Sequence, residues 1–109
     1  MRWYKDLYLG PNAALNIQKI RRKAAAGKWM AGVYYVTLAS VPGNLLDVFH
    51  NTMLRQPLFA DNQCTDIVGV AEGKTEACEL AARIVKEVYD QTGSFDLPLF
   101  FREEDFLSD

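Results

Sequence analysis

The chain has 109 residues, of which 50% are hydrophobic, 24% charged and 12% aromatic. This length predicts a single domain, and the composition excludes a disordered, collagen-like or disulfide-stapled protein. The net charge of −2 hides an uneven distribution: residues 1–28 hold seven basic residues and one acidic residue, and residues 29–109 hold five basic and thirteen acidic residues. The basic end therefore either faces an anionic partner or attracts the acidic end, within one molecule or across a dimer.

The sequence favours a cytoplasmic protein. Its longest apolar run, Trp29–Val36, is much shorter than the roughly 20 residues that a membrane-spanning helix needs. The first ten residues carry three charges and lack the pattern of a secretory signal. Cys64 and Cys78 show no pairing pattern, which suits a reducing compartment. We therefore expect no membrane partner.

The first half of the chain predicts two strands and two helices. Residues 3–9 are rich in aromatic side chains and predict a strand, and apolar residues at helical spacing predict a helix over about 12–26. Residues 29–39 predict a strand covered on both faces, because they are apolar without clean alternation. A second helix is expected from about residue 42 to 55. Turn residues separate these segments at Gly10-Pro11, Gly27, Pro42-Gly43 and Pro57.

The second half predicts a loop over residues 56–65, a short buried strand over 66–71 and a helix over about 75–91. Gly93 stands where a helix-ending glycine belongs. Residues 95–101 are expected to form a last edge strand, and residues 102–109 an acidic, mobile tail. The helix carries a single apolar stripe of Ala77, Leu80, Ala81, Ile84, Val85 and Val88.

The alternation of four strands with three helices predicts an α/β fold. Right-handed crossovers between successive strands would make the sheet mostly parallel, with three to four strands. We expect one α/β domain over residues 1–101.

Four stretches of the chain resemble a family of small bacterial proteins of about 100 residues that has no assigned function. These stretches are RWYKDLYLG, NLLDVFH, IVGVAEGKTEA and IVKEVYDQTGSFD. The resemblance implies a stand-alone cytosolic protein, and it implies no activity, cofactor or site residue.

The stretch Gly69–Thr75 lies between a predicted strand and a predicted helix. A phosphate-binding P-loop has four residues between its glycines, but only three separate Gly69 from Gly73, and Glu72 would place a carboxylate beside the phosphates. A simpler anion site remains open, with Lys74 beside the unpaired amides of a helix start. The alternative is a plain turn in which Thr75 caps the helix.

In a parallel sheet, the loops after the strands would gather at one edge, where ligands of α/β proteins usually bind. A phosphate- or carboxylate-bearing small ligand would then meet five polar residues: Asn12, Ser40, Asn44, Lys74 and Thr75.

Five basic residues crowd the end of the first predicted helix and the residues that follow it: Lys19, Arg21, Arg22, Lys23 and Lys28. Nucleic-acid binding needs several such cations to neutralise phosphates. The pI near 5.3 argues against this partner. The alternative is a solvated face whose positive charge is favourable at a helix C-terminus.

Catalytic and metal-binding patterns are weak. His50 is the only histidine, placed three residues after Asp47 in a predicted helix, and no nucleophile follows at a recognisable spacing. One histidine and two distant cysteines are too few for a zinc site. Cys78 is expected to be a small core residue. We predict no catalytic residue, metal or cofactor.

The sequence therefore favours a non-catalytic binding domain that forms a homodimer. Aromatic residues in the terminal segments, which could pair between subunits as sheet edges, are the expected interface: Trp3, Tyr4, Phe100 and Phe101. A small anionic ligand at the strand ends is the alternative, and nucleic-acid binding through the basic first helix is a lesser one.

Overall fold

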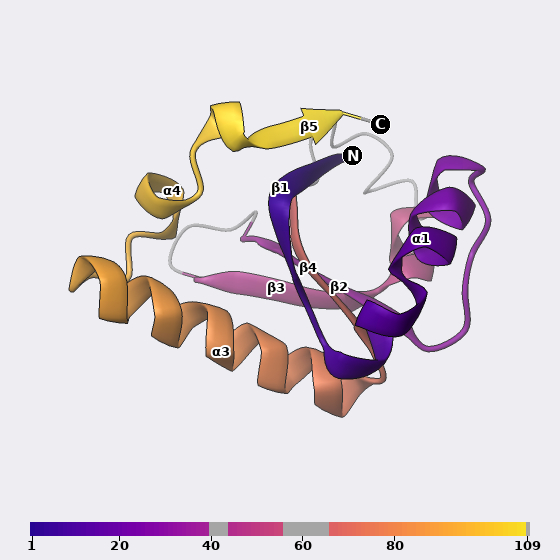
Figure 1. Ribbon diagram of the computed structural model, residues 1–109, viewed down its shortest axis with the longest axis horizontal. Helices are drawn as coiled ribbons and strands as arrows, with labels where there is room; N and C mark the ends of the chain where they lie inside the picture. The colour runs from indigo at the N-terminus through magenta and orange to yellow at the C-terminus, as the bar shows by residue number, and fades with distance from the viewer. Residues whose placement is uncertain (40–43, 56–65, 109) are drawn as a thin grey trace.

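The computed structural model describes residues 1–39, 44–55 and 66–108 (Figure 1). The strands are β1 (Arg2–Leu9), β2 (Val33–Leu38), β3 (Leu46–His50), β4 (Asp66–Glu72) and β5 (Phe106–Ser108). The helices are α1 (Pro11–Ala25), α3 (Lys74–Thr92) and the single-turn α4 (Leu97–Phe100). Two short 3₁₀ turns cover Asn51–Arg55 and Glu103–Asp105. Among the described residues, no helix combines the length and apolar character needed to cross a bilayer.

The five strands form one mixed sheet in the order β3-β2-β4-β1-β5. Only β1 and β4 are parallel, and the other three pairs of neighbours are antiparallel. The expectation of a mostly parallel sheet of three to four strands is therefore wrong. The error begins at residues 46–50, where the predicted helix is a strand instead: β3 runs back along β2, from Leu38 opposite Leu46 to Tyr34 opposite His50. Pairing with β2 prevails over the local helix-start signal.

The end of the chain also differs from its prediction. Residues 95–101 form no edge strand; Asp96 accepts a hydrogen bond from the Leu99 amide and starts α4, and Pro98 cannot donate to a strand ladder. The edge strand is β5, which lies antiparallel to β1. The segment expected to be a mobile acidic tail thus contributes to the sheet.

The sheet has a helix layer on each face (Figure 1). α1 packs on one face over Trp3, Tyr35, Ile67 and Val70. α3 and α4 cover the other face, where the buried stripe of α3 contacts Val36 and Val68. The predicted stripe is confirmed at four of its residues, Ala77, Leu80, Ile84 and Val88, which are buried. Its other two residues, Ala81 and Val85, are half-buried. The predicted end of α3 is also confirmed, because Gly93 adopts a φ of 72° that suits glycine.

Candidate binding site

The structure brings together only some of the five polar residues that were expected to meet a ligand at one edge of the sheet. β1 and β4 are parallel, so Asn12, Lys74 and Thr75 follow strand ends at the same edge, where all three are exposed. Asn44 precedes β3 and lies near the opposite edge, because β2 runs antiparallel to β4 and ends there. Ser40 lies outside the described residues.

The free amides at the start of α1 bind the carboxylate of Glu76, a residue of α3. The Glu76 carboxylate accepts hydrogen bonds from the amides of Glu72 (2.7 Å), Asn12 (3.1 Å) and Ala13 (3.4 Å). Burial alone would raise the pKa of Glu76, but these amide hydrogen bonds outweigh it and hold the pKa below its usual value. A Cβ at Gly10 would lie 2.3 Å from this carboxylate, so a side chain there would displace Glu76 from the amides that donate to it.

The Gly69–Thr75 stretch connects β4 to α3, next to this carboxylate. The amide of Gly73 donates to the carbonyl of Gly32 (2.7 Å), and Gly73 itself is the N-cap of α3. Thr75, predicted to cap the helix, lies within its first turn instead. An external phosphate at this edge would face the charge of Glu76.

The acidic C-terminal segment has its partners on the sheet. Arg2 forms a bidentate pair with Asp66 (2.8 and 2.9 Å) and also contacts Glu103 (2.9 Å). Lys5 contacts Asp105 (3.2 Å), and its hydrogen bond holds the pKa of that carboxyl below the usual value. Glu103 and Asp105 of this segment therefore pair with β1, and Glu104 pairs with Arg102 of the segment itself; none of the three pairs with the basic residues of α1.

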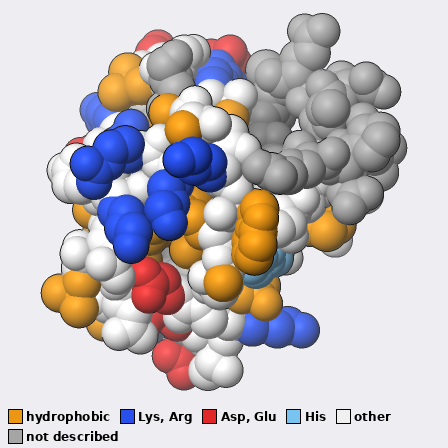
Figure 2. All heavy atoms as spheres, turned by 90° about the vertical axis from the view of Figure 1, so that its right-hand side faces the viewer, with side chains coloured by type: hydrophobic (Ala, Val, Ile, Leu, Met, Phe, Trp, Pro, Cys, Tyr) orange, Lys and Arg blue, Asp and Glu red, His pale blue; other side chains and the backbone are white. Residues whose placement is uncertain are grey.

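The five cations at the end of α1 and just beyond it form what we call the basic surface: Lys19, Arg21, Arg22, Lys23 and Lys28. None of them forms an ion pair with another described residue. All are exposed except Lys23, which is half-buried. The Arg21 guanidinium lies 5.1 Å from the centre of the buried Trp3 ring. Figure 2 shows Lys and Arg side chains gathered on this face of the molecule.

A pocket of about 240 Å³ lies beside the basic surface, between α1 and the segment that leads into β2. Its lining combines cations, an exposed indole, an acid and apolar side chains. Trp29 is 56% exposed here. The complete lining is Asn16, Lys19, Ile20, Lys23, Trp29, Met30, Ala31, Val33 and Glu72.

The segment that carries Trp29 is held in place by the end of β3 and the residue that follows it. The buried Asn51 side chain accepts from the Met30 amide (2.8 Å) and donates to the carbonyls of Met30 and Val33. His50 Nε2 accepts from the Gly32 amide (3.2 Å). Nothing in the sequence near Asn51 indicates this role, because the contact depends on β3 pairing with β2.

Glu72 sits at the strand edge of the pocket. Its Oε1 accepts a hydrogen bond from Asn16 Nδ2 (2.9 Å). The two side chains place an acceptor and a donor in the same lining as Trp29, and the carboxylate offsets part of the positive charge of Lys19 and Lys23.

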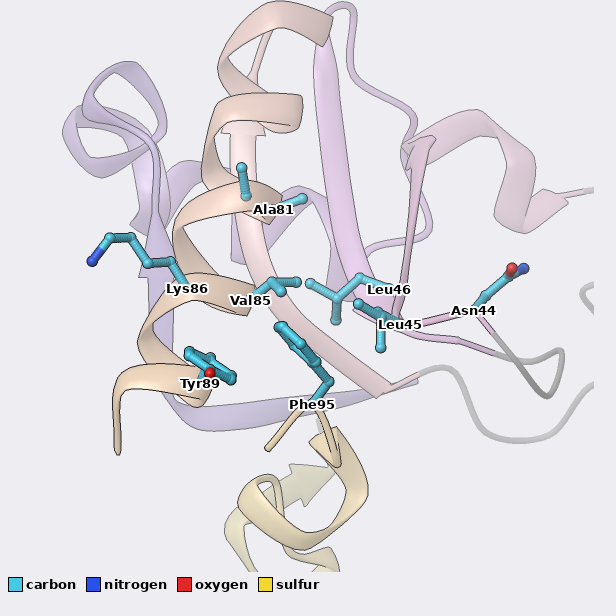
Figure 3. A pocket seen from close by; sticks show the side chains of 9 residues that line it. Asn44, Leu45, Leu46, Ala81, Val85, Lys86, Tyr89 and Phe95 are labelled. Carbon is cyan, nitrogen blue, oxygen red and sulfur yellow. The ribbon is translucent and has the colours of Figure 1, made fainter. Parts of the chain in front are cut away.

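A second hollow, an apolar groove of about 700 Å³, lies between α3 and the start of β3. Leu46, Val85 and Phe95 point toward one another across it (Figure 3). The Phe95 ring is 53% exposed and stacks on Tyr89 at 4.8 Å. The described structure offers no polar or charged cluster inside this groove that would specify a ligand.

The aromatic residues expected at a subunit interface belong largely to the core. Trp3 is 0% exposed and Phe101 is 2% exposed. Tyr4 and Phe100 are half-buried and pack against the same core as Phe101. An interface through Trp3 or Phe101 would require the fold to open, because both side chains belong to the core of the single chain.

The fold does not bring the residues of the weak catalytic patterns, His50 with Asp47 and Cys78, into a catalytic arrangement. His50 and Asp47 lie in a strand, and residues three apart in a strand point to opposite faces, so they form no helical pair. His50 Nδ1 lies 2.8 Å from the Thr52 hydroxyl. Cys78, expected in the core, is exposed. Within the described part of the chain, no three His, Cys, Asp or Glu side chains come together as metal ligands.

Comparison with known proteins does not assign the chain to a family. No family model matches the chain, and no match was found among curated proteins or solved structures. The resemblance to a family of small bacterial proteins therefore stays a prediction.

Proposed function

We propose that this protein is a non-catalytic binding domain for a polyanion, which it holds on the basic surface. One observation carries the proposal: the basic surface has no ion-pair partner among the described residues, while the acidic C-terminal segment is bound to β1. An attraction between the two ends of the chain was the competing explanation for the uneven charge. That attraction does occur for Arg2 and Lys5, which pair with Glu103 and Asp105 of the acidic end. It leaves the five cations of the basic surface without a partner among the described residues.

The helix dipole accounts for only part of the positive charge. Arg22 and Lys23 lie in the last turn of α1, where a cation is favourable. Lys19 and Arg21 precede that turn and Lys28 follows the helix. A cluster of this kind attracts a chain of phosphates by releasing its counterions, and the negative net charge of the rest of the molecule does not prevent a local interaction.

Binding of a polyanion is tested by its dependence on salt. Inorganic polyphosphate and a single-stranded oligonucleotide would be titrated at salt concentrations between about 50 and 200 mM. We expect affinity to fall with salt, and the triple variant Lys19→Gln, Arg22→Gln, Lys23→Gln to reduce the slope of log K against log salt by about 2 for the oligonucleotide.

A matched triple variant, Lys74→Gln, Lys86→Gln, Arg102→Gln, removes the same charge from elsewhere on the molecule. It should retain most of the affinity and slope. Equal losses in the two triple variants, or no binding of either probe at low salt, would show that the basic surface is not a binding site. Circular dichroism of each variant checks that it is folded.

The homodimer expected from the sequence stays a prediction, and sedimentation velocity measures it directly. The expected small anionic ligand would have to bind elsewhere than at the start of α1, since Glu76 occupies those amides.

A further inference from the structure

We infer that the pocket beside the basic surface takes an unpaired base of a single-stranded nucleic acid, stacked on Trp29. The inference rests on the proposed function and narrows the polyanion to one chemical class. In this arrangement the phosphates lie along the basic surface, and one base leaves the strand to enter the pocket.

The first support is the position of Trp29. A tryptophan that is 56% exposed leaves much of its indole without protein contacts, yet its segment is fixed by the hydrogen bonds of Asn51 and His50. Lys19 and Lys23 line the same pocket. A held aromatic face next to cations is the combination that single-strand binding proteins use, because every base can stack while its phosphate meets a positive charge.

The second support is the acid inside the pocket. Glu72 would repel a phosphate placed beside it, so the charged part of a ligand is favoured beside Lys19 and Lys23 of the same lining. An uncharged ring is not excluded in this way. The Glu72 carboxylate accepts hydrogen bonds from the amino groups of bases, and the Asn16 amide lies beside it.

The third support is size. The pocket volume of about 240 Å³ falls below the roughly 300–1,000 Å³ of sites for drug-sized ligands, which suits one planar ring system. Ile20, Met30 and Val33 give it apolar walls. Bases in a duplex are already paired and stacked, so they cannot reach Trp29 without being unstacked at a cost.

The test compares three probes on the intact protein: a single-stranded oligonucleotide without self-complementarity, the same sequence as a duplex, and inorganic polyphosphate of matched length. The chain has two tryptophans, and Trp3 is fully buried, so a base can stack only on Trp29 and quench it by direct contact. We expect the single strand to bind most tightly and to quench the fluorescence strongly, and we expect polyphosphate to bind without strong quenching.

Two substitutions of Trp29 sharpen the test. Trp29→Ala should weaken single-strand binding by about 5- to 100-fold and leave polyphosphate binding unchanged. Trp29→Phe should restore most of the loss, because it keeps an aromatic face. If single strand, duplex and polyphosphate bind equally and Trp29→Ala changes none of them, the base pocket is wrong while the polyanion surface stands. If no probe binds, both fail.

Discussion

The two basic segments of this chain differ in whether their cations have partners within the molecule. Arg2 and Lys5 of β1 lie next to β4 and to the segment that leads into β5, which bring Asp66, Glu103 and Asp105 to them. The basic surface at the end of α1 meets no such acids among the described residues. The sign of the charge alone does not distinguish the two segments. Their neighbours in the fold make the first a structural element and the second a candidate binding surface.

The comparison predicts separate effects of mutation. Substitutions that release the C-terminal segment from the sheet should cost stability, and substitutions on the basic surface should cost binding with little loss of stability.

The largest expected effect is at Phe101, which anchors the chain before β5. Its ring is 2% exposed and packs edge-on against Tyr4 at 4.9 Å. Phe101→Ala should lower the free energy of unfolding by about 3–5 kcal/mol, measured by urea denaturation. The control is Leu99→Ala on the same segment, where the side chain is 75% exposed and the change should be below about 0.5 kcal/mol. Similar effects of the two substitutions would mean that the segment is not packed as described.

The next effect is at Arg2, where both the bidentate pair with Asp66 and the contact with Glu103 are lost on substitution. Arg2→Ala should lower the free energy of unfolding by about 1–3 kcal/mol. The matched substitution on the basic surface, Arg22→Ala, removes the same side chain from an exposed position that has no ion pair with any described residue, and it should cost less than about 0.5 kcal/mol. A larger loss at Arg22 than at Arg2 would reverse the comparison between the two segments.

Acid should weaken the internal anion site. The pKa of Glu76 in the folded protein is below its ordinary value of 4.5, so its contribution to stability is present above that value and is lost as pH falls through the lower pKa. Glu76→Gln should lower stability by about 1–3 kcal/mol at neutral pH. It should also flatten the decline of Tm between about pH 5 and pH 3.

Glu79→Gln, on an exposed position of the same helix, is the control for the pH series. A parallel decline of Tm in Glu76→Gln and the unchanged protein would show that the amides of α1 do not hold this carboxylate.

The smallest expected effect on stability is at Trp29. Because the ring is largely exposed, Trp29→Ala should change the free energy of unfolding by less than about 0.5 kcal/mol. The same variant should bind a dye-labelled single-stranded oligonucleotide about 5- to 100-fold more weakly, a readout that does not depend on the removed indole. Chemical denaturation followed by circular dichroism measures the stability, and titration of the labelled oligonucleotide measures the binding. A large loss of stability would mean that Trp29 supports the core.

Several elements could be predicted because their signals are local. β1, α1, β4 and α3 follow from short apolar runs, helical spacing and the glycines that end them. β3, α4 and β5 could not be predicted in this way, since β3 and β5 are defined by pairing with strands distant in the sequence. One wrong assignment, a helix in place of β3, was enough to turn a mixed sheet into a parallel one.

The sequence by itself determined the cluster of basic residues on α1, the apolar stripe of α3 and the excess of acid toward the C-terminus. The tertiary structure alone decided which charges meet. It brought Glu76 to the amides of α1, the acidic segment to Arg2 and Lys5, and Asn51 to the segment that exposes Trp29. The physical reason is that charge pairing and capping act over a few ångströms, and those distances join residues that lie tens of positions apart in the chain.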